Sequence, residues 1–249
     1  MVKFTVIGGG ASKDLARRLA RRLRAVYIET ETKIFPDGES KITLQKIPKK
    51  SVILVVQSTY PPVDTNMLQA LSIISQVRKI SSRTYAIIPY MGYARQDKQF
   101  LSGEVITMSV VAKMLQSAGA KKVIVVDIHS NTALNHFNIP TENISAIPEL
   151  AKYFKKLNLK NPLVVSPDAG GSSRSKKFAS LLKSDFIVLK KHRDRKTGRV
   201  NIQTTKADVQ GKDLIIVDDM ISTGGSVIKA AQFLKKQKCK RVFVACTHG

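Results

Sequence analysis

Two adjacent carboxylates and a glycine pair follow an apolar run in the segment 214–226. Leu214–Val217 has the length and β-branching of a strand covered on both faces, and apolar residues recur at helical spacing from Ser226 onward. Asp218 and Asp219 lie between them, where carboxylates can accept hydrogen bonds from vicinal hydroxyls. The next residues can bind an anion through backbone N–H groups, two hydroxyls and the positive end of a helix dipole. They are Thr223, Gly224, Gly225 and Ser226. A sugar phosphate meets both demands.

The alternative interpretation of this segment is a strand, an acidic turn and a helix capped by Ser222 or Thr223. An Asp-Asp pair and a Gly-Gly turn are each common, but their combination with a serine at a helix start favours sugar-phosphate binding. The stretch from Val217 to Ser226 also resembles the phosphoribosyl-binding loop of the phosphoribosyltransferase fold. That resemblance implies the fold and the sugar phosphate, but not the reaction.

Composition limits the class of protein. A chain of 249 residues with 43% hydrophobic content can bury one large core or two of ordinary size. No apolar run approaches the roughly 20 residues that span a bilayer, and the N-terminus lacks a signal-peptide pattern, so we expect a cytoplasmic protein with no membrane partner. The spacing of Cys239 and Cys246 fits neither a metal knuckle nor a redox pair, and we assign these thiols no function.

The net charge of +24 arises because 42 Lys and Arg face only 18 Asp and Glu. Nucleic acids, anionic membranes and anionic small substrates are all candidate partners for such a chain. The basic residues are widely spread and are interpreted mostly as solvated helix faces. An aromatic content of 6% without any Trp disfavours a nucleic-acid reader, although RNA association stays open as an alternative.

The acids are scarcer, so their positions carry more information. Seven of them fall at predicted strand ends or in loops between periodic segments: Asp37, Glu39, Asp97, Asp127, Asp168, Asp218 and Asp219. Hard oxygen ligands that leave several waters on the metal are what magnesium prefers. Their placement therefore suits the binding of magnesium and of hydroxyl groups.

Strands and helices are predicted to alternate, as in an α/β protein with mostly parallel sheets. Apolar runs at 2–7, 52–56, 85–88 and 123–126 predict strands, and helical patterns fall at about 13–24, 65–80, 104–117, 146–157, 172–182 and 226–236. The run Gly8-Gly9-Gly10 follows a strand and precedes a helix but lacks the full dinucleotide fingerprint, so it is interpreted as a tight turn.

One α/β unit is predicted to be present twice, because the order of motifs repeats. Strand-like runs at 51–58, 85–89 and 121–130 match those at 162–166, 186–189 and 212–222, with a basic loop at 90–98 in the first copy and at 190–199 in the second. Two domains, 1–142 and 143–249, follow from this match. The first copy would carry a degenerate phosphate loop at 127–130.

These tandem units resemble the ribose-phosphate pyrophosphokinase family over essentially the whole chain. The motifs that carry the resemblance, in order, are Phe35–Ser40, Pro89–Lys98, Pro167–Gly171, Lys191–Arg193 and the 217–226 loop. The resemblance implies two tandem phosphoribosyltransferase-like domains, ATP and ribose 5-phosphate as substrates, Mg²⁺ as cofactor, and self-association into a dimer or larger oligomer. It also implies transfer of the β,γ-pyrophosphoryl group of ATP to the C1 hydroxyl of ribose 5-phosphate.

The resemblance assigns roles to individual residues. Lys191 and Arg193 would be catalytic, as cations that close over the transferred group. ATP would be bound by Arg95, Gln96 and His129, with Phe35, Asp37 and Glu39 reaching from a neighbouring subunit, and the metal by His129 and Asp168. Ribose 5-phosphate would be bound by Asp168, Asp218, Asp219, Ser222, Thr223, Gly224, Gly225 and Ser226.

Two departures from the family pattern bear on activity. Ser222 stands where many relatives carry a third acid, and the family normally continues through a further strand and helix after the position of Gly249. The alternative function is a non-catalytic or regulatory protein of this fold that binds nucleotide or RNA. The retained Lys191, Arg193, Arg95 and Gln96 favour the enzyme. Oligomer size, nucleotide preference and control by ADP or phosphate are not specified by the sequence.

Overall fold

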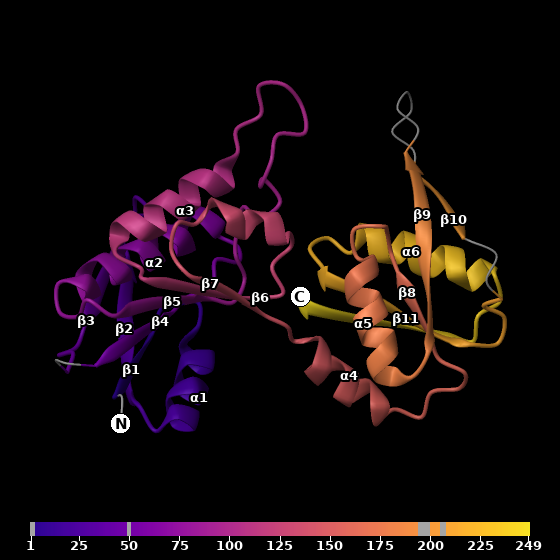
Figure 1. Ribbon diagram of the computed structural model, residues 1–249, viewed down its shortest axis with the longest axis horizontal. Coiled ribbons are helices and arrows are strands. Elements are labelled where there is room, and N and C mark those ends of the chain that lie inside the picture. Colours follow the sequence, from indigo (N-terminus) through magenta and orange to yellow (C-terminus); the bar gives the residue numbers. More distant parts are fainter. Residues whose placement is uncertain (1–2, 49–50, 194–199, 205–207) are drawn as a thin grey trace. The chain divides into compact units, whose positions relative to one another are not determined.

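The computed structural model describes residues 3–48, 51–193, 200–204 and 208–249, with the backbone alone described for 190–193 and 200–204. The chain divides into two compact units, Met1–Ile144 and Ser145–Gly249, which we call unit 1 and unit 2 (Figure 1). Each unit is an α/β fold in which helices cover a mostly parallel sheet, as the sequence predicts. No helix in the described part of the chain combines the length and apolar character needed to cross a membrane.

Unit 1 contains a seven-stranded sheet in the order β3-β2-β1-β4-β5-β6-β7. Every adjacent pair is parallel except β2 and β3, which form an antiparallel hairpin at one edge. The strands are β1 (Phe4–Gly8), β2 (Val26–Ile34), β3 (Ser40–Leu44), β4 (Val52–Val56), β5 (Thr84–Ile88), β6 (Lys122–Val126) and β7 (Thr141–Ile144), and the helices are α1 (Lys13–Leu23), α2 (Val63–Arg78), α3 (Thr107–Ala118) and the 3₁₀ helix η1 (Asn131–His136).

The core of unit 1 lies on both faces of this sheet because β4 is buried throughout. Its Ile53 and Val55 pack in the cluster that contains α2 and α3, whereas its Val52, Leu54 and Val56 pack with α1. Alternating side chains on one strand thus fix helices to opposite faces.

Unit 2 contains a five-stranded sheet in the order β10-β9-β8-β11-β12, with only β9 and β10 antiparallel. Ile215 and Val217 of β11 pack in the cluster of α4 and α5, and Leu214 and Ile216 pack with α6. The strands are β8 (Leu163–Ser166), β9 (Asp185–Arg193), β10 (Val200–Thr204), β11 (Asp213–Met220) and β12 (Arg241–His248), and the helices are α4 (Ile147–Lys155), α5 (Ser172–Leu182) and α6 (Gly225–Lys236).

The two sheets repeat one topology, but the strands that correspond to each other are not the ones that the sequence predicts. The order β3-β2-β1-β4-β5 of unit 1 matches β10-β9-β8-β11-β12 of unit 2, including the antiparallel edge strand. The counterpart of β11 is therefore β4, and not β6, which lies outside the shared five strands. The prediction that 127–130 is the degenerate copy of the phosphate loop is wrong, because the loop after β4 occupies that place.

The prediction of a basic loop at 190–199 is wrong for residues 190–193. These continue β9 to Arg193 and pair with β10, so that Lys191 lies opposite Ile202 and Arg193 opposite Val200. Residues 194–199 lie outside the described residues. Strand β2 and the edge strands β3, β7 and β10 were not predicted, because their polar residues dilute the apolar signal on which a strand prediction depends.

Candidate functional site

In unit 2 the predicted sugar-phosphate residues gather where two neighbouring strands end. β8 leads through α5 to β9 on one side, and β11 leads through α6 to β12 on the other. Adjacent parallel strands whose connections leave in opposite directions form a crevice at their carboxyl ends, where ligands of open α/β sheets bind. Asp168 lies in the loop after β8. Asp218 and Asp219 are the last two residues of β11 before its end at Met220.

The acid pair lies inside β11 rather than after it, because the strand continues to pair with β12 as far as Met220. Asp219 is 3% exposed, and its backbone N–H donates to Asp218 Oδ1 at 2.9 Å. Burial, followed by a hydrogen bond to the Asp219 carboxyl and the negative charges of Asp219 and Asp168, raises the pKa of Asp218 to about 6. Two carboxylates held this close, one of them buried and one half-buried, offer several acceptor oxygens to hydroxyl donors.

A cation that the sequence analysis missed lies beside this pair. Arg174, in the first turn of α5, places Nη1 3.4 Å from Asp219 Oδ1 and 3.8 Å from Asp218 Oδ1, and its side chain is only 16% exposed. The available sequence signal was an arginine three residues after the Gly170-Gly171 pair at a helix start. Arg174 joins the loop after β8 to the acids of β11.

The loop after the acid pair leads into α6, and several backbone N–H groups where it joins the helix have no hydrogen-bond partner in the described residues. Ile221 N–H donates to His248 O at 2.8 Å, and the first hydrogen bond of α6 runs from Ile228 N–H to Gly224 O. Within the described residues, the N–H groups of Thr223, Gly224, Gly225 and Ser226 form no hydrogen bond. They form the predicted cradle at the positive end of a helix.

The cap of α6 differs from the alternative interpretation of the sequence. The N-cap residue is Gly224, with φ of +74°, and neither Ser222 nor Thr223 caps the helix through its side chain. A glycine tolerates this left-handed conformation at no steric cost. Both hydroxyls are consequently left for a ligand.

Asp168 is partly engaged by its own loop. Its Oδ1 accepts the N–H of Gly171 at 3.1 Å, and its backbone oxygen accepts the hydroxyl of the buried Ser166 at 2.7 Å. The loop has little room at Gly171, where a Cβ would lie 3.0 Å from Ser166 Oγ. These contacts fix the position of the Asp168 carboxylate in the loop between β8 and α5.

In unit 1 the predicted ATP residues Arg95, Gln96 and His129 are exposed and lie on two loops that contact each other. The contact is made by Asp97, which is 6% exposed and whose Oδ2 accepts the hydroxyls of Ser130, at 2.6 Å, and of Thr132. Burial alone would raise the pKa of Asp97, but these two hydrogen bonds outweigh it and lower the pKa. Asp97 thus links the Arg95–Gln96 loop, which follows β5, to the His129 loop, which follows β6.

Phe35, Asp37 and Glu39 lie on the exposed turn between β2 and β3. Gly38 N–H donates to Phe35 O, and Glu39 N–H donates to Asp37 Oδ1 at 3.1 Å. Strands β1 and β4 separate β2 from β5 in the sheet, so this turn and the loop that carries Arg95 belong to different strands. The backbone of Lys191 and Arg193 occupies alternate positions of β9; their side chains lie outside the described residues.

Comparison with known proteins identifies the family. Residues 4–119 match the model of the N-terminal domain of ribose phosphate pyrophosphokinase, and residues 140–249 match that of the phosphoribosyl transferase domain. Ribose-phosphate pyrophosphokinase of Pasteurella multocida (strain Pm70) is 37% identical over all of this chain and 80% of its own length. That of Methanobrevibacter smithii is 37% identical over 98% of this chain and 85% of its own length.

A solved structure agrees with these sequence matches. The crystal structure of phosphoribosylpyrophosphate synthetase from Mycobacterium smegmatis is 30% identical to this chain, with a TM-score of 0.89, and the match covers 99% of this chain and 81% of that one. Both halves of the chain match the same family in sequence and in fold. The chain therefore belongs to the ribose-phosphate pyrophosphokinase family.

Proposed function

We propose that this protein transfers the β,γ-pyrophosphoryl group of ATP to the C1 hydroxyl of ribose 5-phosphate, forming phosphoribosyl pyrophosphate and AMP. The observation that carries the proposal is an acid pair at the end of β11, with Asp219 buried and Asp218 half-buried, followed within one loop by a helix N-terminus with open amides. The hydroxyls and the phosphate of one sugar phosphate match these two features. The names of the relatives support the reaction.

Ribose 5-phosphate is bound at both ends in this proposal. The cradle of residues 222–226 binds the 5-phosphate, and the carboxylates of Asp218 and Asp219 accept hydrogen bonds from the ribose hydroxyls. Arg174 keeps the two carboxylates oriented and compensates part of their charge. A sugar fixed in this way presents its C1 hydroxyl as the reactive end.

In the chemical step the C1 oxygen forms a bond to the β-phosphorus of ATP. The bond from the β-phosphorus to the oxygen that bridges to the α-phosphorus breaks, AMP leaves with that oxygen, and the hydroxyl proton passes to solvent. Lys191 and Arg193 are the proposed cations that stabilise the charge on the transferred group. Such a step needs positioning and charge neutralisation more than a strong base.

ATP is assigned to the linked loops of unit 1. Arg95 offers a guanidinium for phosphate oxygens, and Gln96 and His129 offer further polar contacts. His129 and Asp168 are each proposed as ligands of Mg²⁺ beside substrate oxygens, and the ion would neutralise charge on the phosphates.

The residues present suit this ion. The charge of Asp168 contributes to raising the pKa of Asp218, so this end of the sheet offers the carboxylate oxygens that Mg²⁺ prefers. Among the described residues no group of three or more His, Cys, Asp and Glu forms a metal cage. An ion bound through one or two protein ligands and substrate phosphates requires no such cage.

The β2–β3 turn is proposed to complete the ATP site of a neighbouring subunit through Phe35, Asp37 and Glu39. The turn is exposed, and it lies on different strands from the Arg95 loop. The active form is then a dimer or larger. Light scattering during turnover checks this, and a fully active monomer would contradict it.

Phosphorus NMR of the products tests the reaction. With ATP, ribose 5-phosphate and Mg²⁺ we expect phosphoribosyl pyrophosphate and AMP, and no product when the sugar is omitted. Asp218→Asn combined with Asp219→Asn should raise the KM for ribose 5-phosphate far more than that for ATP. Asp208→Asn, at an exposed acid of the same unit, is the matched control. An unchanged KM for the sugar in the double variant would refute the assignment of the acid pair.

A further inference from the structure

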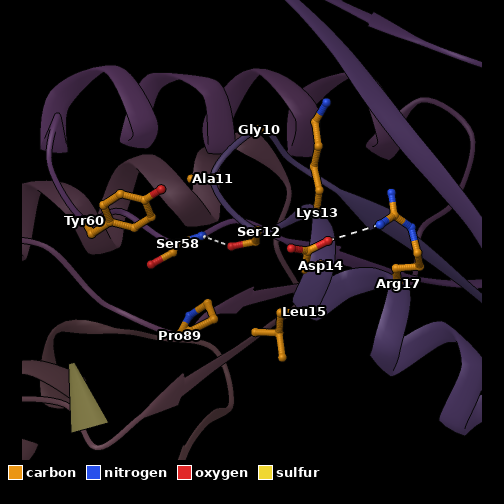
Figure 2. Close-up of a pocket in the computed structure, with 10 residues that line it drawn as sticks. All are labelled: Gly10, Ala11, Ser12, Lys13, Asp14, Leu15, Arg17, Ser58, Tyr60 and Pro89. Carbon is orange, nitrogen blue, oxygen red and sulfur yellow. Dashed lines mark hydrogen bonds and ion pairs between the residues drawn. The ribbon is translucent and has the colours of Figure 1, made fainter. Parts of the chain in front are cut away.

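Unit 1 has its own crevice at the place that corresponds to the sugar-phosphate site of unit 2. In the shared topology β1 and β4 are the counterparts of β8 and β11, and their connections likewise leave in opposite directions. A pocket of about 560 Å³ lies there, at the carboxyl ends of β1 and β4 (Figure 2). This volume is in the range of small-ligand sites.

The loop between β1 and α1 is held rigidly along this pocket. Ala11 N–H donates to Oε1 of the fully buried Gln57 at 3.1 Å, and Ser12 Oγ accepts the N–H of Ser58 at 2.7 Å. Gly9 packs so closely that a Cβ there would lie 2.1 Å from Gln57 Oε1. The loops after β1 and after β4 are thus fastened to each other before any ligand binds.

This arrangement leaves donors without partners. The Ser12 hydroxyl is the natural cap of α1, but it accepts from Ser58 instead and makes no cap hydrogen bond. Within the described residues, the N–H groups of Lys13, Asp14 and Leu15 form no hydrogen bond, and all three residues line the pocket. These are first-turn amides at the positive end of an eleven-residue helix.

An independent observation comes from Ser58, which lies on the other loop. Ser58 is 7% exposed and lines the pocket, yet in the part of the chain that the structure describes its hydroxyl has no hydrogen-bond partner. Figure 2 shows this hydroxyl turned away from Ser12, toward the side of the pocket where Tyr60 and Pro89 lie. A hydroxyl on a largely buried residue is normally bonded, and the partner of this one has to come from the pocket, as water or as a ligand.

The charges at the pocket are locally balanced. Lys13 Nζ lies 2.8 Å from Glu29 Oε1, and Arg17 pairs with Glu29 at 3.0 Å and with Asp14 at 3.1 Å. The attraction for an anion therefore comes from the amides, the helix dipole and the Ser58 hydroxyl. Such a donor set fits the several oxygens of one phosphate group.

We propose that this pocket of unit 1 binds the phosphate group of a small metabolite, either inorganic phosphate or a sugar phosphate. The phosphate lies against the amides of Lys13, Asp14 and Leu15 and accepts the Ser58 hydroxyl. In a phosphate ester the organic part lies toward Tyr60 and Pro89. This site is separate from the loop of residues 222–226, and it stands whether or not the proposed reaction is correct.

The test is amide NMR on the ¹⁵N-labelled full chain, titrated separately with inorganic phosphate, ribose 5-phosphate and neutral ribose. The amide signals of residues 13–15 should shift and saturate with both phosphates and stay fixed with ribose. The tighter of the two phosphates identifies the source of the ligand. Absence of any shift at residues 13–15 with either phosphate would overturn the proposal.

Variants separate this site from the one in unit 2. Ser58→Ala should weaken phosphate binding at residues 13–15 by about tenfold, because one hydrogen bond to a charged group is lost. Its melting temperature without phosphate should match the wild type, since the hydroxyl has no protein partner to lose. Thr223→Ala, in the unit 2 cradle, should leave the shifts at residues 13–15 intact.

A second substitution protects the test if Ser58→Ala folds poorly. Ser58→Cys keeps the side-chain size but offers a weaker donor, and it should bind phosphate with intermediate affinity. Wild-type affinity in both variants, or loss of the shifts at residues 13–15 in Thr223→Ala, would contradict the proposed site.

Discussion

Arg174 Nη1 lies 3.4 Å from Asp219 Oδ1, so that α5 supplies a cation to the acid pair of β11. The second carboxylate, Asp218, is 3.8 Å from the same nitrogen. Asp219 is almost fully buried and Arg174 largely so, and a charge in such a place requires a partner. In the proposed site Arg174 is therefore a positioning residue, which would act on the ribose through the two carboxylates.

Replacing Arg174 should change the acid pair measurably. In Arg174→Met the pKa of Asp218 should rise further above its value of about 6, because a nearby positive charge is lost. The affinity for ribose 5-phosphate should fall by about tenfold, or about 1.4 kcal/mol. Carboxyl ¹³C NMR measures the pKa and calorimetry the affinity. Arg174→Lys should recover part of both effects, whereas an unchanged pKa in Arg174→Met would contradict this role.

The pH dependence of the free protein should reveal Asp218 directly. Its folded-state pKa of about 6 exceeds the ordinary value of 3.8, so between these two pH values the folded state keeps a proton that the unfolded state has lost. The contribution of Asp218 to stability therefore falls as the pH rises from 3.8 to 6. Above 6 the carboxylate is ionised, and in the proposed site it would then accept the ribose hydroxyls, so sugar binding should strengthen through this range.

The substrate complicates that measurement, because a sugar phosphate also loses a proton near pH 6. Asp219→Asn resolves the two effects, since it removes a charge that raises the pKa of Asp218 but leaves the substrate unchanged. The midpoint seen by carboxyl NMR should move to lower pH in this variant. A midpoint that stays near pH 6 in this variant would contradict the claim that Asp219 raises the pKa of Asp218.

The sequence predicted the parts of this site that are local. The strand 214–217, the acids after it and the glycine pair are consecutive, so their chemistry can be inferred from one segment. Arg174 was missed because it is 45 residues from Asp219 in the chain and meets it only through the order of β8 and β11 in the sheet. A sequence pattern contains no record of which strands are neighbours.

In unit 1, Asp97 should affect ATP and not the sugar. Asp97→Asn replaces the carboxylate by a neutral amide, which accepts the hydroxyls of Ser130 and Thr132 more weakly and so loosens the link between the Arg95–Gln96 loop and the His129 loop. A loss of about 1–2 kcal/mol predicts a rise in the KM for ATP of roughly 5- to 30-fold, with the KM for ribose 5-phosphate unchanged. Steady-state kinetics with each substrate varied in turn measures the split.

A smaller effect is expected for Ser130→Ala, which removes one of the two donors to Asp97. Melting temperatures of both variants control for general destabilisation. Equal increases of the two KM values would show that Asp97 supports the fold of unit 1 and does not position the ATP loops in particular.

Asp213 should stabilise unit 2 in a pH-dependent way. Hydrogen bonds from Arg241, at 2.9 and 2.6 Å, outweigh burial and lower the pKa of Asp213 to about 2. A depressed pKa means that ionised Asp213 stabilises the fold above its ordinary value of 3.8, and that this contribution is lost as the pH falls from 3.8 to about 2. Since Arg241 is 46% exposed and screened by solvent, we expect about 1–2 kcal/mol.

Urea denaturation of wild type and Asp213→Asn at several pH values checks this contribution. The difference between the two free energies of unfolding should be constant near neutral pH and should shrink below 3.8. Asp208→Asn, at an exposed acid nearby in sequence, should show no such trend. A difference independent of pH would mean that the charge of Asp213 is not what stabilises the fold.

The fold class was predictable, but the correspondence between the two units was not. β4 and β6 are both five-residue strands dominated by branched apolar residues, so either could match β11 on pattern alone. In the hairpin strand β2, Glu29, Glu31 and Lys33 occupy one face and Thr30 and Thr32 stand on the other, so few apolar residues mark the strand. Without β2 and β3 the repeat cannot be aligned correctly. Only the sheet order shows that the loop after β4 is the counterpart of the phosphate cradle.

The central claim is that the β-phosphorus of ATP is attacked by the sugar, and positional labelling tests it most directly. ATP carrying ³²P at either the β or the γ position is incubated with ribose 5-phosphate and Mg²⁺, and the products are separated by chromatography. If the β,γ-pyrophosphoryl group is transferred, both labels should enter the sugar product equally, and one AMP should form for each phosphoribosyl pyrophosphate. Transfer of the γ label alone with formation of ADP, or AMP formed without the sugar, would contradict it.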